Sequence, residues 1–135
     1  MRIMGLDIGD KRIGVALSDP GGILASPFTI IECTGDEEDI RVVIDIIEQH
    51  EVGKIIVGLP RLMSGTVGQQ AVKVEAFVER LRGHTQVPIE LRDERLSTVS
   101  ARRLMQSTGR KTKKKPRYDA AAAAVILQAY LEEGR

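Results

Sequence analysis

Acidic residues at three well-separated points of the sequence could together hold a metal ion. Asp7 lies inside the apolar run from Ile3 to Ile8, and Asp93 and Glu94 follow a second apolar stretch. Asp119 comes directly before a run of alanines. A buried carboxylate without a partner costs free energy, and a bound cation would remove that cost. Mg²⁺ or Mn²⁺ suits such a site, because these hard cations prefer oxygen ligands and need only a few carboxylates besides water and substrate phosphate.

Metal ions held by these carboxylates would support the cleavage of a phosphodiester bond. A metal pair can activate a water molecule and stabilise the leaving oxygen, so that no nucleophilic side chain is needed. The sequence offers no competing machinery, since His50 ends an amphipathic stretch, His84 lies in a polar turn, and Cys33 has no obvious basic partner. The glycine-rich phosphate-binding patterns GxxxxGK(S/T) and GxGxxG do not occur in the sequence.

Two of the acids also have a structural interpretation that involves no metal. Asp7 could shape the turn into a hairpin, although Gly9 and Asp10 can make that turn alone. Asp119 could be an N-terminal helix charge that the helix dipole favours. That second role is compatible with metal binding, so it does not decide against the site.

The remaining acidic position holds two neighbouring candidates. On a regular strand, Asp93 shares a face with Ile89 and Leu91, and it could be purely structural. Glu94 lies on the other face or just beyond the strand, and its side chain reaches further. Periodicity therefore leaves the choice between Asp93 and Glu94 open.

The elements that carry these acids follow from hydrophobic periodicity, beginning with three short strands. The run from Ile3 to Ile8 is followed by a tight turn and by large and small side chains that alternate up to Leu17, which predicts a hairpin. An extended stretch from Ile23 to Ile31 comes after a second turn. Because Pro27 cannot donate a hydrogen bond to a neighbouring strand, this third strand should lie at the edge of the sheet.

The rest of the chain alternates between helical and strand patterns. Apolar residues at i, i+3, i+4 and i+7 predict a helix from Asp36 to about His50, with Asp36 as its cap. Short apolar runs between helices are typical of buried parallel strands. The further predicted elements are a strand at Lys54 to Leu59, a helix ended by Gly83 with the inner stripe Ala71, Val74, Phe77, Val78 and Leu81, a strand at Val87 to Leu91, a short helix at Ser97 to Thr108 and a last helix at Asp119 to Glu133.

This order of elements predicts an α/β fold in which helices flank a mixed five-stranded sheet. Three hairpin-linked strands form an antiparallel meander, and right-handed parallel crossovers add two more strands. The expected strand order is 3-2-1-4-5, within a single domain that covers residues 1–135. The first strand is then central, and open α/β sheets bind their ligands at the carboxyl ends of such strands. The three acidic positions could therefore converge there.

Composition narrows the setting in which the protein works. The 135 residues carry 20 Lys and Arg against 19 Asp and Glu, so overall charge gives no reason to expect a polyanionic partner. Six cations gather between Arg110 and Arg117, a run typical either of a solvated loop or of an arm that contacts phosphates. The sequence has no signal-peptide pattern, no apolar run of membrane length and a single cysteine, Cys33, so we expect a cytoplasmic protein without membrane contact.

Four blocks of sequence resemble a known family across nearly the whole chain. They are MGLDIGDKRIGVALSD (Met4 to Asp19), VGLPRLMSGTVG (Val57 to Gly68), DERLST (Asp93 to Thr98) and YDAAAAAVILQAYL (Tyr118 to Leu131). In this order they are similar to the YqgF family, also called the RuvX or Holliday junction resolvase-like family. The resemblance implies a ribonuclease H-like fold, a divalent-metal nuclease activity and, for many bacterial members, trimming of the 5′ end of pre-16S ribosomal RNA.

The resemblance also implies which acids bind the metal. Asp7 matches the acid of the family's first-strand DxG motif, Glu94 the glutamate of the DER block, and Asp119 the acid that opens the last helix. Asp93 is the reserve candidate for the metal ligand of the DER block. The fourth predicted strand ends without the glutamate that junction resolvases proper carry there, so the DER block is its natural substitute. Tyr118 departs from the aliphatic residue usual in the family and could change how the helix start packs or stacks on a base.

The expected function is that of a nuclease acting on structured RNA during ribosomal RNA maturation. Phosphates would be held by Arg95 and by residues of the basic segment, namely Lys111, Lys113, Lys114, Lys115 and Arg117. One alternative is a resolvase of branched, four-way DNA, which would be a symmetric dimer. Another is a nucleic-acid-binding module such as a transcription factor, in which the acids are structural and binding needs no metal. The sequence leaves both a monomer and a homodimer open.

Overall fold

The computed structural model describes residues 1–59, 69–93 and 118–133. Its elements are β1 (Arg2–Ile8), β2 (Arg12–Ser18), β3 (Ala25–Glu32), α1 (Asp36–Gln49), β4 (Val52–Leu59), α2 (Gln69–Arg82), β5 (Ile89–Asp93) and α4 (Tyr118–Glu133). The helix expected from Ser97 to Thr108 lies outside these residues. None of the helices that the structure describes has both the length and the apolar character needed to span a membrane.

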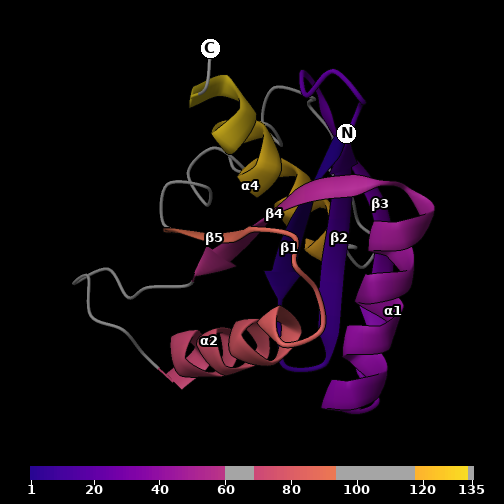
Figure 1. Cartoon of the computed structure of the whole chain (residues 1–135). Helices are drawn as coiled ribbons and strands as arrows, with labels where there is room; N and C mark the ends of the chain where they lie inside the picture. The colour runs from indigo at the N-terminus through magenta and orange to yellow at the C-terminus, as the bar shows by residue number, and fades with distance from the viewer. Residues whose placement is uncertain (60–68, 94–117, 134–135) are drawn as a thin grey trace.

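The five strands form one sheet in the order β3-β2-β1-β4-β5, which confirms the prediction. β1 lies at the centre, antiparallel to β2 and parallel to β4, and β4 is in turn parallel to β5. The carboxyl ends of β1, β4 and β5 therefore meet at one edge of the sheet (Figure 1). Asp7 is the second-last residue of β1, so the sheet places it at this carboxyl edge.

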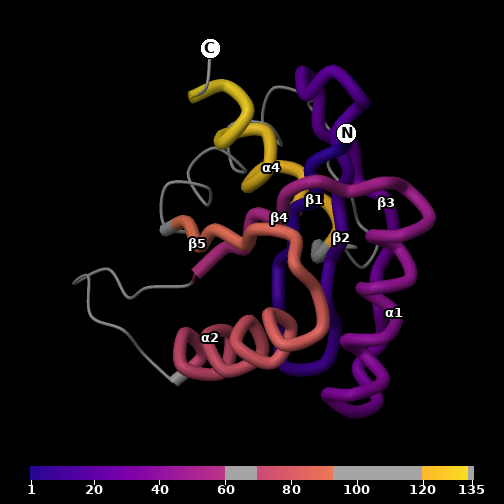
Figure 2. Tube along the Cα trace, viewed as in Figure 1, coloured from indigo at the N-terminus to yellow at the C-terminus, as the bar shows by residue number. Residues whose placement is uncertain are grey.

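Helices cover both faces of the sheet. α1 and α2 lie on one face and α4 lies on the other (Figure 2). Met4, Leu6 and Ile8 of β1 belong to a large core that includes residues of α1 and α2, among them all five residues of the predicted inner stripe of α2. The opposite face of the sheet forms a smaller core with α4, to which β2 contributes Ala16 and β4 contributes Ile56. Alternate residues of β1 thus face different helices.

The start of α1 differs from the prediction. The N-cap residue is Gly35, and no side chain in the described part of the protein caps the helix, so the expectation that Asp36 is the cap is wrong. Asp36 is the first residue inside the helix, where its carboxylate lies 3.7 Å from the Arg80 guanidinium. Asp39 reaches back instead and accepts a hydrogen bond from the backbone N–H of Thr34 at 3.1 Å, which accounts for its near-complete burial.

The two edge strands of the sheet also depend on prolines. β5 covers Ile89–Asp93 and not Val87 to Leu91, because Pro88 offers a carbonyl to the Ile55 N–H at 2.9 Å but has no N–H of its own. β3 pairs with β2 only, and Pro27 lies at an irregularity in their register. The expectation that β3 is an edge strand is therefore confirmed.

Candidate active site

Asp7 occupies the face of β1 that α4 covers. Its backbone pairs with Gly14 of β2, and its side chain is half-buried. Met4, Leu6 and Ile8 point into the core beneath α1 and α2. Strand alternation therefore turns Asp7, together with Gly5, toward α4.

At Gly5 the backbone of β1 comes very close to α4. A Cβ atom built on Gly5 would lie 2.9 Å from the carbonyl oxygen of Ala123 and 2.9 Å from the Cβ of Leu127. Carbon atoms essentially never come that close to backbone atoms of a packed helix. Glycine in the strand and small residues in the helix thus let α4 rest directly on the strand that carries Asp7, which gives the alanine run its packing role.

α4 runs in the opposite direction to β1. Near its carboxyl end, the Gln128 side chain accepts a hydrogen bond from the Ala25 N–H at 2.8 Å, and the Tyr130 hydroxyl accepts one from Lys54 at 2.7 Å. Ala25 begins β3 and Lys54 is near the start of β4, so both lie at the amino edge of β1. The other end of α4, which contains Asp119, therefore points to the carboxyl edge.

Asp7 and Asp119 lie at similar distances from the contact of Gly5 with Ala123, both in the direction of the carboxyl edge of the sheet. Asp7 comes two residues after Gly5, which is about 7 Å along a strand. Asp119 comes four residues before Ala123, which is about 6 Å along a helix. The structure describes the backbone of Asp119 in the first turn of α4 and not its side chain.

The end of β5 supplies the third acidic position of this edge. Leu59 of β4 pairs with Asp93, so the two strands end together. β5 is two strand spacings from β1, or about 10 Å. The structure describes the backbone of Asp93, whereas Glu94 and the candidate phosphate-binding residues lie outside the described part of the chain. Those residues are Arg95, Lys111, Lys113, Lys114, Lys115 and Arg117.

The donor set at this edge is made of oxygens. No group of three or more His, Cys, Asp and Glu side chains placed to hold a metal ion occurs among the residues whose side chains the structure describes. Among the candidate ligands, Asp7 is the one whose side chain belongs to these described residues. β4 ends in Gly58 and Leu59 without a carboxylate. Carboxylate oxygens fit Mg²⁺ or Mn²⁺ and not a soft metal.

Comparison with known proteins decides the family. The family model for RuvX, described as a Holliday junction resolvase, matches residues 1–133. The chain belongs to the RuvX family. Two relatives bear the name "Putative pre-16S rRNA nuclease": the protein of Desulforamulus reducens is 49% identical over 99% of this chain and 98% of its own length, and that of Thermoanaerobacter pseudethanolicus is 48% identical over 98% and 96%. The expected family and its nuclease class are confirmed.

Solved structures confirm the ribonuclease H-like fold of this RuvX protein. Thermus thermophilus RuvC in complex with a Holliday junction substrate superposes with a TM-score of 0.67 at 12% identity, covering 99% of this chain and 95% of that one. Fowlpox virus resolvase, solved with Holliday junction DNA, gives 0.55 at 16% identity, covering 98% of each chain. At this level of identity the likeness concerns the fold alone.

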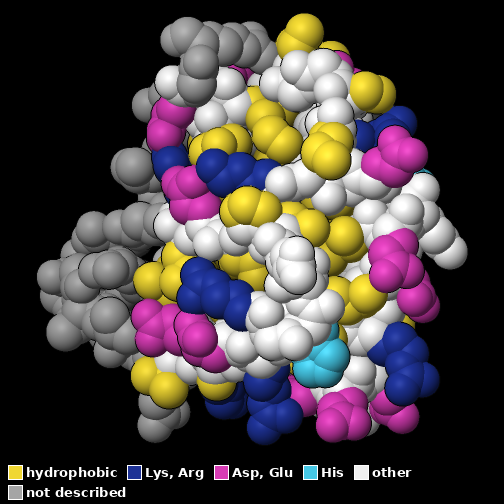
Figure 3. Space-filling model, in the orientation of Figure 1, with side chains coloured by type: hydrophobic (Ala, Val, Ile, Leu, Met, Phe, Trp, Pro, Cys, Tyr) yellow, Lys and Arg dark blue, Asp and Glu magenta, His cyan; other side chains and the backbone are white. Residues whose placement is uncertain are grey.

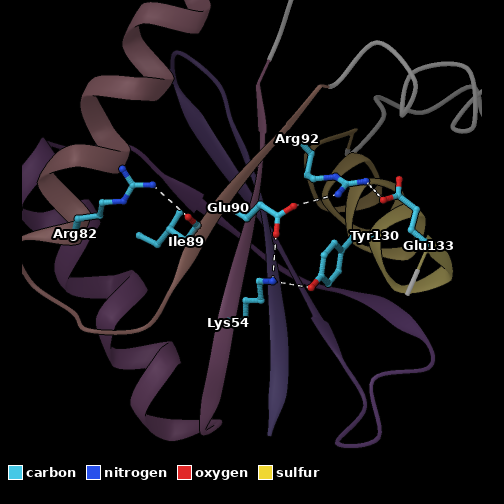
Figure 4. Close-up of polar contacts among 7 residues, drawn as sticks. All are labelled: Lys54, Arg82, Ile89, Glu90, Arg92, Tyr130 and Glu133. Carbon is cyan, nitrogen blue, oxygen red and sulfur yellow. Dashed lines mark hydrogen bonds and ion pairs between the residues drawn. The ribbon is translucent and has the colours of Figure 1, made fainter. Parts of the chain in front are cut away.

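A polar bridge between the sheet and α4 escaped the sequence prediction for this RuvX chain. It consists of Lys54, Glu90, Arg92, Tyr130 and Glu133 (Figure 4). Hydrogen bonds from Arg92 and then from Lys54 hold the pKa of the Glu90 carboxyl below its usual value. The bonds to Tyr130 and Glu90 raise the pKa of Lys54. The sequence signal was weak, because it consists only of charged residues that alternate with apolar ones along β5.

The face covered by α1 and α2 has a separate cleft of about 360 Å³. Asp10, Asp36, Lys73 and Cys33 are among the residues that line it, and Lys73 pairs with Asp10 at 3.1 Å. Burial and the neighbouring Asp39 raise the pKa of the Cys33 thiol to about 11. Charged side chains of both signs are interspersed with apolar ones on this face (Figure 3). The cleft lies across the sheet from Asp7 and is distinct from the candidate site.

Proposed function

We propose that this chain is a divalent-metal-dependent nuclease that processes the 5′ end of pre-16S ribosomal RNA in the cytoplasm, with Asp7, Glu94 and Asp119 as its metal ligands. The observation that carries the proposal is the contact of Gly5 with Ala123, which brings the strand of Asp7 and the helix of Asp119 together with both acids toward the carboxyl edge. The names of the relatives support the choice of RNA substrate. Residues 1–135 would form one nuclease domain.

The alternation of β5 supports Glu94 over Asp93 as the third ligand. Ile89 and Leu91 pack at the border of the core beneath α1 and α2. Glu90 and Arg92 bond to residues on the α4 side of the sheet. Asp7 also faces α4. If the alternation of β5 continues beyond Arg92, the next residue on this side is Glu94. Asp93 remains the reserve ligand.

The protein's own groups would bind and orient the substrate in this mechanism. The three carboxylates would hold Mg²⁺ or Mn²⁺, which when bound supplies activation of water and stabilisation of the leaving oxygen. Arg95 and the basic segment from Lys111 to Arg117 would hold the phosphates on either side of the cleaved bond. A backbone phosphate gripped just before α4 would lie beside Asp119, so binding and cleavage would share one edge of the sheet.

The description of the RuvX family as a Holliday junction resolvase makes resolution of branched DNA the second candidate function. The non-catalytic alternative, a nucleic-acid-binding module, predicts binding that does not respond to metal. Both can be tested in one experiment. The pure protein is incubated with Mg²⁺ or Mn²⁺ and with precursor 16S RNA, single-stranded DNA or four-way DNA junctions.

The matched variants for this experiment are Asp7→Asn and Asp10→Asn. Asp10 lies three residues further along the chain and pairs with Lys73 at the cleft across the sheet. We expect metal-dependent cleavage of the precursor RNA by the wild type and by Asp10→Asn, and its loss in Asp7→Asn with cooperative unfolding retained. Cleavage of the four-way junction alone would establish the resolvase, and binding without cleavage would support the non-catalytic module. Loss of both cleavage and cooperative unfolding in Asp7→Asn would assign Asp7 a structural role.

A further inference from the structure

The polar bridge is a continuous set of contacts that runs from β4 through β5 to the end of α4 (Figure 4). The Glu90 carboxylate lies between two cations, with one oxygen 3.1 Å from Lys54 Nζ and the other 3.1 Å from an Arg92 nitrogen. Arg92 pairs in addition with Glu133 in the last turn of α4. Lys54 closes the set by donating to the Tyr130 hydroxyl at 2.7 Å.

The bridge differs from the scattered ion pairs of the surface in two respects. Lys54 lies 4.8 Å and Arg92 5.5 Å from the centroid of the Tyr130 ring, so one aromatic side chain contacts both cations. Two cations and two carboxylates also balance in charge, and the Arg92 side chain is only 27% exposed. A partly buried network of this kind holds its members in place more firmly than an isolated exposed pair does.

Glu133 is an unexpected residue at the end of a helix. The carboxyl end of a helix carries partial negative charge, which disfavours an acid there. The pairing with Arg92 offsets this repulsion. The Arg92 guanidinium thus compensates the unfavourable position of this carboxylate at the helix end.

The bridge is also what joins α4 to β5. In the described part of the protein, the apolar core beneath α4 draws its strand residues from β1 to β4 and none from β5. On its other side, β5 is held by the packing of Leu91 and by a hydrogen bond from Arg82 to the Ile89 carbonyl at 3.2 Å. The Arg92 contacts with Glu90 and Glu133 thus tie the end of β5 to the helix that carries Asp119.

We propose that Arg92, held between Glu90 and Glu133, is a positioning residue that fixes the end of β5, at Asp93, relative to α4. This inference rests on the proposed function. Arg92 acts through the backbone of β5, two residues before Glu94, and it does not itself bind metal. Removal of its helix partner should loosen the end of β5 and weaken metal binding without unfolding the protein.

The test compares Glu133→Ala, which removes the partner of Arg92, with Glu133→Gln, which keeps an acceptor oxygen. Glu32→Gln is the control, since it removes a carboxylate from an exposed pair with Arg12 at the opposite edge of the sheet. Three quantities are measured: hydrogen exchange of the β5 amides, Mn²⁺ affinity by titration without substrate, and the kcat and KM of cleavage. The melting temperature of each variant shows whether the fold is intact.

We expect Glu133→Ala to speed hydrogen exchange of the β5 amides and to weaken Mn²⁺ binding relative to the wild type and to Glu32→Gln. The kcat should fall with little change in KM, and Glu133→Gln should recover part of each loss. Unchanged exchange in β5, or faster exchange with wild-type Mn²⁺ affinity, would overturn the inference. Arg92→Gln is measured in the same way. If this variant raises KM and leaves Mn²⁺ affinity intact, the positioning role is overturned and Arg92 is instead a phosphate-binding residue.

Failure of the proposed function would be visible in the wild type and not in the variants. A wild-type protein that binds no Mn²⁺ and shows no metal-dependent cleavage would overturn the nuclease mechanism and this inference with it. Wild-type binding and cleavage that all Glu133 variants retain would overturn the positioning role alone.

Discussion

The Gly5 α-carbon faces the Ala123 carbonyl so closely that a single added Cβ atom would lie 2.9 Å from that oxygen. The contact joins the central strand β1 to α4. From this contact, Asp7 lies two residues further along the strand and Asp119 lies four residues back along the helix. The nearest atoms of the helix are the Ala123 carbonyl oxygen and the Leu127 Cβ, whose positions the helix backbone fixes, so a rotamer change cannot relieve a clash with them. The size of the residue at position 5 therefore controls how deeply α4 sits on the sheet.

The first prediction follows from that contact. Gly5→Ala should lower the free energy of unfolding by about 1–3 kcal/mol, the usual effect of overpacking, and should weaken Mn²⁺ binding because α4 must move outward with Asp119. Urea denaturation and Mn²⁺ titration measure the two effects. Gly83→Ala is the control, since its added Cβ would meet its nearest neighbour, the Arg80 carbonyl oxygen, at an ordinary 3.4 Å. A Gly5→Ala protein with wild-type stability and metal affinity would contradict the prediction.

The second prediction separates the two acids of the DER block. Glu94→Gln should lower turnover at saturating metal far more than Asp93→Asn does, because Glu94 is the proposed metal ligand and Asp93 only its reserve. The reason for the order is the side of the sheet on which Glu90 and Arg92 make their contacts. Both variants are compared on one substrate. The reverse order of turnover would move the ligand assignment to Asp93.

The third prediction concerns the basic segment, which we expect to bind substrate without affecting the metal. Each phosphate contact contributes roughly 0.7–0.9 to the slope of log affinity against log salt concentration. Alanine at Lys113, Lys114 and Lys115 should weaken nucleic-acid binding and flatten that slope by about two units if all three engage. Mn²⁺ affinity should stay at the wild-type value. With Arg41→Ala as a control for one lost surface charge, an unchanged slope in the triple variant would identify the segment as a solvated loop.

The fourth prediction concerns pH and the turn between β2 and β3. The Asp19 carboxylate accepts hydrogen bonds from the backbone N–H groups of Leu24 at 2.8 Å, Ile23 at 2.7 Å and Gly21 at 3.1 Å, and the first of these lowers its pKa most. A lowered pKa in the folded protein means that the stabilisation is complete above the unfolded-state value of about 3.9 and is lost as pH falls through the folded-state value.

Asp19→Asn should accordingly melt at a lower temperature than the wild type at pH 7. The difference in melting temperature should shrink as pH falls through the folded-state pKa of Asp19, because the wild-type carboxyl is then uncharged, as the Asn side chain is at every pH. Melting curves from pH 7 down to about 2 measure it, with the exposed helix residue in Asp45→Asn as the matched control. A difference in melting temperature that stays constant with pH would show that the turn does not depend on the charge of Asp19.

The strand order could be predicted because local signals determine it. The tight turn after Ile8 forces an antiparallel hairpin, Pro27 excludes β3 from the interior, and the apolar run that ends at Leu59 is typical of a strand buried on both faces. The element ends were less predictable. The apolar Val87 predicts an earlier start for β5, but Pro88 delays regular pairing. At its other end, β5 continues through the polar residues Arg92 and Asp93, because β4 still runs beside it there.

The sequence proposes members for the candidate site but does not predict how the elements that carry them meet. Asp7 and Asp119 are recognisable from their places in a strand and at the start of a helix, and the structure adds the contact at Gly5 that relates these two elements. That contact depends on which turn of α4 meets β1, and no local periodicity encodes this choice. The polar bridge was unpredictable for the same reason, since Lys54 and Tyr130 are 76 residues apart in the chain.

The late position of α4 has a consequence for synthesis on the ribosome. β1 and β2 leave the exit tunnel first, but one side of the central strand stays bare until residues 118–133 have been translated. Chains grow at about 5–20 residues per second, so the interval lasts several seconds. Pairing across this sequence distance gives the fold a high contact order, which slows its completion. A nascent chain of this topology would therefore complete the edge that carries the proposed metal ligands only after α4 has emerged, close to its own site of synthesis and to ribosomal RNA.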